Sequence, residues 1–278
     1  MQHPTKENPT YLMNAKLQLP DNSRMRVPTS VLSKRTPHGD LIFGANLTPR
    51  YTIVDLHIDQ GRDGLIVCVE DSKKIVLMWP ATNLNMNLLQ ECSYHQANLV
   101  RVGSQLEGGI AVMADSSKSL IMYSGTIHAT ITLESGILVG INWVSVESYR
   151  PAFRCFAYEM TVDLESDFGN ILGILVLQLE ASLQGLDHTR HEKVISDWVD
   201  IYTDLVSKCA KRSTKNVLHQ LEKLRTVFEE FFTRNPTLQI PCCSSTDSFQ
   251  HHFRLVHLKD LCPPMQGGGR SSTRRKLN

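Results

Sequence analysis

The sequence predicts an α+β protein in which an antiparallel β-module, partly propeller-like or barrel-like, precedes a C-terminal helical hairpin. Short β-branched segments recur at roughly ten-residue spacing between positions 51 and 180, and Gly, Ser, Asp and Lys separate them as turn signals. After Leu186 the apolar residues recur at helical spacing instead. Runs of strands followed by helices are typical of α+β proteins and exclude a doubly wound parallel sheet.

Four regions follow from this change in pattern. Residues 1–40 are rich in Pro, Asn, Thr, Ser and Lys and are predicted to form a flexible arm, with one possible short strand near Met25–Val27. Residues 41–186 form the predicted β-module and residues 187–236 the predicted helical hairpin. Residues 237–278 contain a Cys/His-rich segment and then a basic tail, predicted to be disordered from about residue 264.

The β-module begins with the alternating stretch YTIVDLHI. In Asp63–Pro80 two apolar runs flank Asp71-Ser72-Lys73, a good turn signal, and this pattern predicts a β-hairpin. Further strands are expected at NLVRVG, GGIAVMA, SLIMYS and TIHATITL, and then at Phe153–Leu164 and Ile171–Glu180. The total is about ten strands.

Local signals bound the two helices of the hairpin. Asp187 is the predicted N-cap of the first helix, and Ser213 or Thr214 that of the second. Asn235-Pro236 is expected to end the second helix, because proline cannot continue it.

Charge and composition limit the function classes. The 278 residues carry a net charge of +1, so no general attraction to nucleic acid is expected. The N-terminus does not resemble a signal peptide, and the most apolar run, Ile171–Leu179, is too short to span a bilayer. Seven cysteines without a CxxC pair suggest reduced thiols in the cytosol or nucleus.

The residues show no catalytic signature. A GxSxG elbow, a phosphate-binding GxGxxG or GxxxxGK[ST] loop and an HExxH helix are all missing. We therefore expect a protein that is not an enzyme, without a cofactor or a small-molecule substrate, that binds other proteins.

One stretch near the C-terminus nevertheless contains several residues of the types that bind zinc. Thiolates and imidazoles are the usual zinc ligands, but the stretch lacks the Cys-x2–4-Cys pair of standard fingers, so an incidental cluster is the competing interpretation. The candidate ligands are Cys242, Cys243, His251, His257 and Cys262.

Two further surfaces are weak candidates for binding. Ser135–Tyr149 has a single charged residue and, as a helix, would be amphipathic enough to lie in a membrane interface, whereas its β-branched content favours a buried strand. Two basic stretches could contact phosphate or direct nuclear import, or simply solubilise a loop and the tail. The membrane candidates are Ile137, Leu138, Ile141, Trp143 and Val144, and the basic ones are Lys211, Arg212, Lys215, Arg274, Arg275 and Lys276.

Three segments resemble parts of the scaffold nucleoporins of the Y-shaped nuclear pore complex. Asp63–Pro80 is similar to a propeller hairpin of that family, Asn98–Ile141 to the following blade, and Asn216–Phe232 to a helix of its helical stack. The resemblance implies a non-enzymatic scaffold in the nucleus or nuclear envelope, otherwise in the cytoplasm, with a membrane-curvature sensor at Ser135–Tyr149. The alternatives are a small β-barrel or polo-box-like interaction module unrelated to the pore, and a zinc-binding protein.

Overall fold

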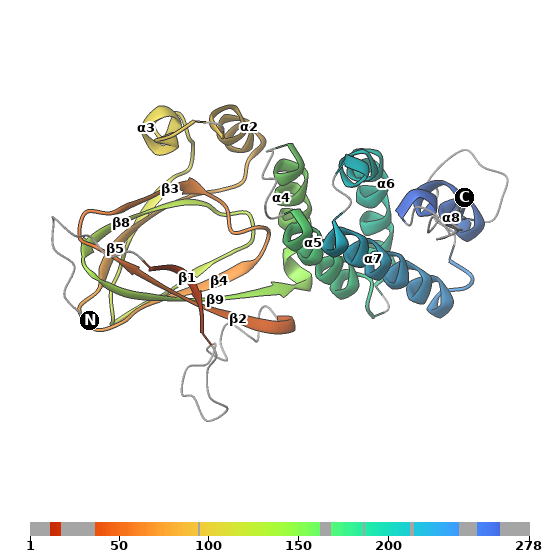
Figure 1. Ribbon diagram of the computed structural model, residues 1–278, viewed down its shortest axis with the longest axis horizontal. Coiled ribbons are helices and arrows are strands. Elements are labelled where there is room, and N and C mark those ends of the chain that lie inside the picture. The colour runs from red at the N-terminus through yellow and green to blue at the C-terminus, as the bar shows by residue number, and fades with distance from the viewer. Residues whose placement is uncertain are drawn as a thin grey trace, which may run out of the picture.

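Two antiparallel sheets face each other at one end of the molecule, and helices pack against them and extend to the other end (Figure 1). The computed structural model describes residues 12–17, 37–93, 95–161, 168–185, 187–211, 214–238 and 249–261. The strands are β1 (Leu12–Lys16), β2 (Pro37–Thr48), β3 (Ile53–His57), β4 (Asp63–Cys68), β5 (Lys73–Trp79), β6 (Ile110–Ala114), β7 (Ser119–Met122), β8 (Ile127–Glu134) and β9 (Gly136–Ser145). The helices are α2 (Asn83–Cys92), α3 (Asn98–Val102), α4 (Tyr149–Thr161), α5 (Phe168–Ser182), α6 (His188–Lys211), α7 (Lys215–Arg234) and α8 (Phe249–His257).

The strand order is that of a jelly roll. A five-stranded large sheet has the order β1-β2-β9-β4-β7, and a four-stranded small sheet has the order β3-β8-β5-β6. All the pairings are antiparallel, and consecutive strands from β2 onward mostly belong to opposite sheets. Such double-sheet folds bury the inner faces of both sheets against each other. The barrel-like form of the β-module, rather than successive propeller blades, is therefore the one observed.

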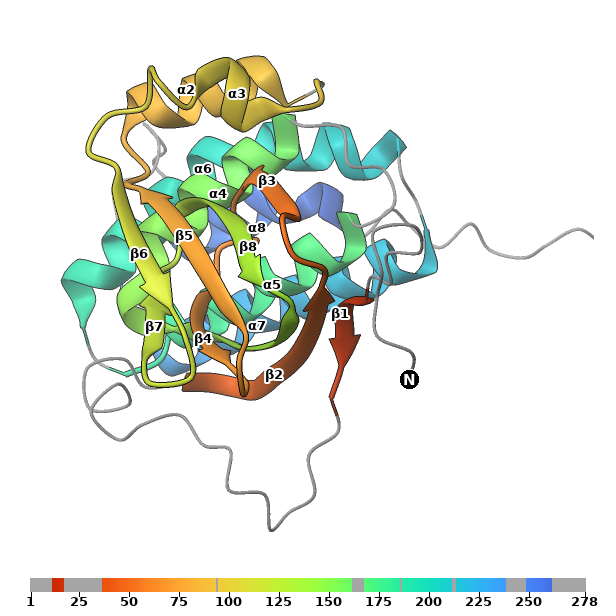
Figure 2. The ribbon, with the colours of Figure 1, turned by 90° about the vertical axis from the view of Figure 1, so that its left-hand side faces the viewer.

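The space between the sheets is filled by side chains from both of them. Strand β5 alternates, with Lys74, Val76 and Met78 buried toward the interior. On the outer face of the small sheet, α2 and α3 cover one end of the strands (Figure 2). The interior apolar cluster consists of Ile66, Cys68, Val76, Met78, Ala114, Met122 and Leu138.

The predicted hairpin of β4 and β5 is wrong, although both strands are present. Strand β4 pairs with β7 and β9 in the large sheet, whereas β5 pairs with β6 and β8 in the small one. The Asp71–Lys73 turn reverses the chain, but a local turn signal does not decide which strands pair. The partners are supplied by strands about 30 to 80 residues further along the chain.

Three segments predicted as strands are helices. NLVRVG contains α3, Phe153–Leu164 lies largely in α4, and Ile171–Glu180 lies within α5. Helix α5 is buried among the large sheet, α4, α6 and α7, and its residues are apolar on nearly all sides. A short run of apolar residues without helical periodicity does not distinguish a strand from a buried helix, so this segment was predicted as a strand. Part of the region predicted to be a flexible arm is a strand: β1 pairs with β2, and β2 itself begins at Pro37. The short strand predicted near Met25–Val27 lies outside the described residues.

The helical hairpin is confirmed together with its end signals. The Asp187 carboxylate accepts a hydrogen bond from the Arg190 N–H at 3.0 Å, and the Thr214 hydroxyl accepts one from the Val217 N–H at 3.3 Å. Helix α7 ends at Arg234, directly before Asn235-Pro236. The apolar faces of α6 and α7 form the second large core, which includes Val194, Trp198, Leu205, Leu221, Leu224 and Phe228. No helix in the described ranges is long and apolar enough to cross a membrane.

The buried His191 makes the helical core sensitive to acid. Its side chain is 0 % exposed and packs edge-on against Phe231, and burial lowers the pKa of His191. Below about pH 6.5 the imidazole of His191 is protonated in the unfolded chain, whereas burial opposes its protonation in the folded protein. The contribution of His191 to the free energy of unfolding is therefore fully present above this pH and is lost as the pH decreases. We expect His191→Leu to flatten the acid side of the stability curve in urea unfolding. The exposed His219→Leu control should keep the wild-type slope, and equal slopes in all three proteins would contradict this role.

Candidate metal centre

Three side chains at one end of the jelly roll converge on a common point. His57 ends β3, Asp59 lies in the turn after it, and His128 comes from the adjacent strand β8. One potential ligand atom from each residue lies within 4.8 Å of the others. The Nε2 atoms of His57 and His128 are 3.7 and 4.0 Å from the two Asp59 carboxylate oxygens. Two neighbouring ligand atoms bound to one ion at ~2.1 Å lie ~3.0 to 3.4 Å apart, so these side chains would have to draw together by less than about 1 Å to share a metal ion.

The other nitrogen of each imidazole contacts a backbone oxygen. His57 Nδ1 lies 2.7 Å from the Asp55 carbonyl oxygen, and His128 Nδ1 lies 3.1 Å from that of Thr126. A carbonyl oxygen only accepts, so Nδ1 carries a hydrogen in both rings, and in a neutral imidazole of this form Nε2 is the nitrogen with the lone pair. Such contacts orient metal-binding histidines.

Burial keeps His128 in the form that binds metals. The side chain is buried at the inner face of β8, and burial lowers the pKa of His128 although the Asp59 carboxylate opposes this effect. The imidazole is therefore neutral at neutral pH, as metal coordination requires.

A tight turn positions Asp59. The Arg62 N–H donates to the Asp59 carbonyl at 2.9 Å, and both central residues, Gln60 and Gly61, have positive φ angles of 42° and 74°. A Cβ on Gly61 would lie 3.2 Å from the Ala152 Cα, so glycine allows the turn to pack directly against α4. Helix α4 thus supports the acidic ligand from behind.

Asp55 connects strand β3, which carries His57, to helix α3. Its carboxylate accepts hydrogen bonds from the Asn98 and Leu99 N–H groups at 2.6 and 2.8 Å. Burial alone would raise the pKa of Asp55, but the backbone hydrogen bonds outweigh it and lower the pKa. The same residue supplies the carbonyl that contacts His57 Nδ1, so α3 helps to hold the first histidine ligand.

A buried cation lies in the same interior. Residues 128 and 132 are four apart on β8 and share its inner face, and Thr132 pairs in register with Lys74. The Lys74 ammonium donates to the hydroxyls of Thr132, at 2.9 Å, and of Thr48. Lys74 is 2 % exposed, and burial lowers its pKa. In the described part of the structure its hydrogen-bond partners are the neutral hydroxyls of Thr48 and Thr132, which do not compensate the charge of an ammonium group.

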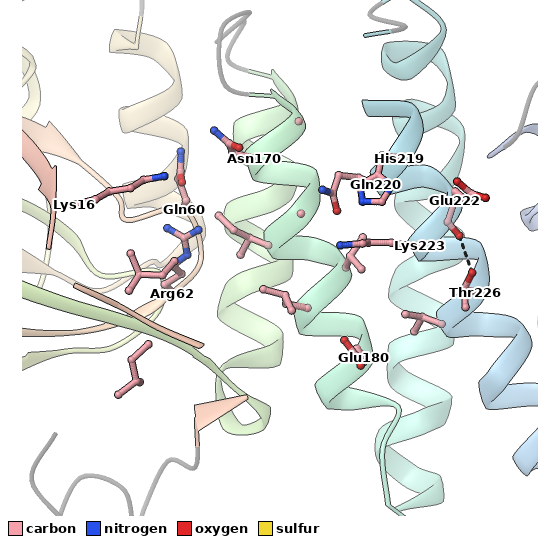
Figure 3. A pocket seen from close by; sticks show the side chains of 18 of the residues that line it. Lys16, Gln60, Arg62, Asn170, Glu180, His219, Gln220, Glu222, Lys223 and Thr226 are labelled. Atoms are coloured by element: carbon pink, nitrogen blue, oxygen red, sulfur yellow. Dashed lines mark hydrogen bonds between the residues drawn. The ribbon is translucent and has the colours of Figure 1, made fainter. Parts of the chain in front are cut away.

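A cleft of about 1080 Å³ runs over α5, between the large sheet and α7. Gln60 and Arg62, from the turn that carries Asp59, lie at one side of it, and Gln220 and Lys223 of α7 lie across α5 (Figure 3). Charges of both signs line the cleft, including Lys16, Glu180 and Glu222. The turn that carries Asp59 therefore borders this cleft.

His57, Asp59 and His128 are residue types that bind metal ions together in a known class of site. Two histidines and one carboxylate, leaving other coordination positions open, form the facial triad of non-haem Fe(II) oxygenases. The sequence is 29% identical over 93 residues to the JmjC domain-containing histone demethylation protein 1 of Kluyveromyces lactis. The match covers 33% of this chain, and the chain spans about a fifth (20%) of the length of that relative. No protein-family model matches the sequence.

These findings correct the functional prediction. The similarity to a histone demethylation protein and the His-Asp-His cluster contradict the expectation of a non-enzymatic scaffold, and with it the alternatives of a polo-box-like module and a zinc protein built on the C-terminal stretch. The prediction of a non-enzymatic protein was wrong because the three residues do not form one continuous motif. His57 and Asp59 lie at the end of β3, whereas His128 lies on β8. The resemblance to scaffold nucleoporins stays an untested prediction.

Neither of the two predicted zinc ligands in the described part of the chain, His251 and His257, belongs to this centre. His251 is exposed on α8, while His257, at the end of α8, is buried against Phe253 and Tyr202. Cys242, Cys243 and Cys262 lie outside the described residues.

The membrane candidates and two of the basic candidates, Lys211 and Lys215, lie in other described parts of the chain. Ser135–Tyr149 contains strand β9, which confirms the strand interpretation over the helical one. Leu138, Ile141, Trp143 and Val144 are buried, and Ile137 is 44% exposed. Lys211 ends α6 and Lys215 begins α7, both exposed, whereas Arg212, Arg274, Arg275 and Lys276 lie outside the described part of the chain.

The triad lies on segments that were predicted as strands, although its residues were not among the predicted site residues. His57-Ile58-Asp59 is a His-x-Asp motif at the end of an alternating strand, which places both side chains near one strand terminus. His128 lies in the TIHATITL strand, 69 residues after Asp59. A search for His-x-Asp followed by a histidine on a later strand could have found the site.

Proposed function

We propose that this chain binds a divalent iron ion through His57, Asp59 and His128 and belongs to the oxygenase class of enzymes. The convergence of these three ligand atoms within 4.8 Å carries the proposal. A bound Fe(II) would supply the activation of dioxygen for oxidation of a substrate. The two imidazoles would hold the ion as neutral donors, and the Asp59 carboxylate would offset part of its charge.

Lys74 supports a second element of this function. An ammonium inside the jelly roll, on the same inner surface as His128, offers a binding group for the carboxylate of a small acidic co-substrate. Thr48 and Thr132 would orient the ammonium from the large and small sheets. This proposal departs from the expectation that the protein has no small-molecule substrate.

The similarity to a histone demethylation protein suggests the substrate class. We propose that the chain acts on methylated side chains of a histone-like protein in the nucleus, and that the cleft over α5, between the large sheet and α7, receives this protein. The position of the cleft next to the Asp59 turn supports it as the binding site for the protein substrate, because Gln60 and Arg62 belong to the turn and also line the cleft.

Metal titration tests the core of the proposal. Under anaerobic conditions the purified chain should bind about one Fe(II) per molecule, and Co(II) should give a visible absorption spectrum typical of nitrogen and oxygen ligands. Affinity should fall as the pH decreases, because protons compete with the metal ion for the imidazole nitrogens. Failure of both ions to bind at neutral pH would refute the metal centre.

A further inference from the structure

A hollow of about 340 Å³ lies beside the barrel end that carries His128. Three segments form it: the chain after β5, the β7–β8 loop and the first turns of α4. Its lining residues are Pro80, Ala81, Ser124, Gly125, Thr126, Arg150, Pro151 and Arg154. Two of these residues are basic and none is acidic, so the hollow has a positive character that the net charge of the chain does not reveal.

The two arginines are placed to act together. Arg150 and Arg154 are four residues apart on α4 and so share one face of the helix. Arg154 Nη1 donates to the Ala81 carbonyl across the hollow at 3.3 Å. Among the residues that the structure describes, neither guanidinium forms an ion pair. Two unneutralised guanidinium groups at one hollow favour a ligand with paired oxygens.

Ser124 is an independent sign of a ligand site. Its side chain is 6% exposed, and its hydroxyl has no hydrogen-bond partner in the described structure. Its backbone N–H, by contrast, donates to the buried Asp63 carboxylate at 2.9 Å and fixes the residue in place. A buried hydroxyl without a partner is costly, and a ligand oxygen at the hollow would satisfy it.

Gly125 shapes the floor of the hollow. It has a φ of +81°, and a Cβ there would lie 3.2 Å from the Pro151 Cβ and 3.4 Å from the Ala81 Cβ. The missing side chain lets the β7–β8 loop approach the start of α4, where the helix dipole also favours negative charge.

We propose that this hollow binds an oxyanion, a phosphate or carboxylate group, through Arg150, Arg154 and the Ser124 hydroxyl. Its position connects it to the metal centre, because the Thr126 carbonyl that lines the same loop contacts His128 Nδ1. An anion in the hollow would therefore hold a charged part of a substrate next to the metal-binding end of the barrel. The anion site itself requires no metal.

Calorimetric titration of the full chain with inorganic phosphate, and separately with acetate, tests the site at constant ionic strength. We expect phosphate, acetate or both to bind the wild type, and the Arg150→Gln/Arg154→Gln variant to bind the same anion at least about tenfold more weakly. The matched control, Arg101→Gln/Arg225→Gln, removes the same charge elsewhere and should retain wild-type affinity. The anion that binds more tightly identifies the ligand group.

A second variant keeps the test valid if the double variant is unstable. Ser124→Ala removes only an unpartnered hydroxyl, so it should fold normally and lower the anion affinity several-fold. No binding of either anion to the wild type, or equal affinity in the wild type and both hollow variants, would overturn the proposal. These titrations are done without metal, so a failure of the metal centre would leave their outcome unchanged.

Discussion

Replacing Asp59 by alanine is expected to weaken Co(II) or Fe(II) binding by at least about 100-fold. The substitution removes the anionic member of the triad and leaves two neutral imidazoles, one of them buried. Because the Asp59 side chain projects from a turn rather than from the packed core, the fold should survive its loss. Co(II) absorption and anaerobic calorimetry measure the change, and circular dichroism verifies folding.

Two comparisons separate loss of a ligand from a general effect. His128→Ala should produce a loss of similar size, since each residue supplies one ligand atom. His95→Ala removes an exposed histidine away from the triad and should bind metal as the wild type does. Wild-type affinity in Asp59→Ala would mean that the ion binds elsewhere, and the proposed centre would have to be abandoned.

Replacing Asp63 by alanine is expected to destabilise the protein by about 3 kcal/mol. This carboxylate is 0% exposed and accepts hydrogen bonds from the Ser124 N–H at 2.9 Å and from the Ser145 and Ser148 hydroxyls, both at 2.6 Å. It thereby joins the start of β4, the loop before β8 and the end of β9. Its removal leaves buried donors without their acceptor and opens a polar cavity.

Urea unfolding followed by tryptophan fluorescence measures this loss. Asp115→Ala, in the β6–β7 turn, is the matched control, because its carboxylate accepts hydrogen bonds from Ser117 at the surface. That variant should unfold close to the wild-type midpoint. If Asp63→Ala also unfolded there, Asp63 would not hold the strands together. Asp63 also fixes Ser124, so its loss should weaken phosphate binding at the hollow.

The helical hairpin was predictable because its signals are local. Asp187 and Thr214 cap helices through atoms three residues away, and Pro236 stops a helix through its own ring. Helix α4 was predictable in principle by the same means. Tyr149, Phe153, Phe156 and Met160 recur at three- and four-residue spacing, and all four are buried.

The candidate site was predictable only in part. His57 and Asp59 are two residues apart, so one strand end brings them together whatever the rest of the chain does. His128 joins them because β8 pairs with β3, with His57 opposite His128 in the register. The sequence of neither segment determines this pairing, because the alternating pattern of β8 is compatible with many partner strands. Lys74 meets Thr48 and Thr132 for the same reason, across both sheets.

The sequence by itself determined the local structure of this protein: the presence of strands β4 and β5, the N-caps of α6 and α7, the end of α7, and the α+β class. These features depend on propensity, periodicity and capping groups within a few residues of each other. Only the tertiary structure decided that β4 and β5 separate into facing sheets, that α5 is a helix, and that His57, Asp59 and His128 converge. Those outcomes depend on contacts between segments tens of residues apart, whose free energy is realised only when the jelly roll closes around its buried interior.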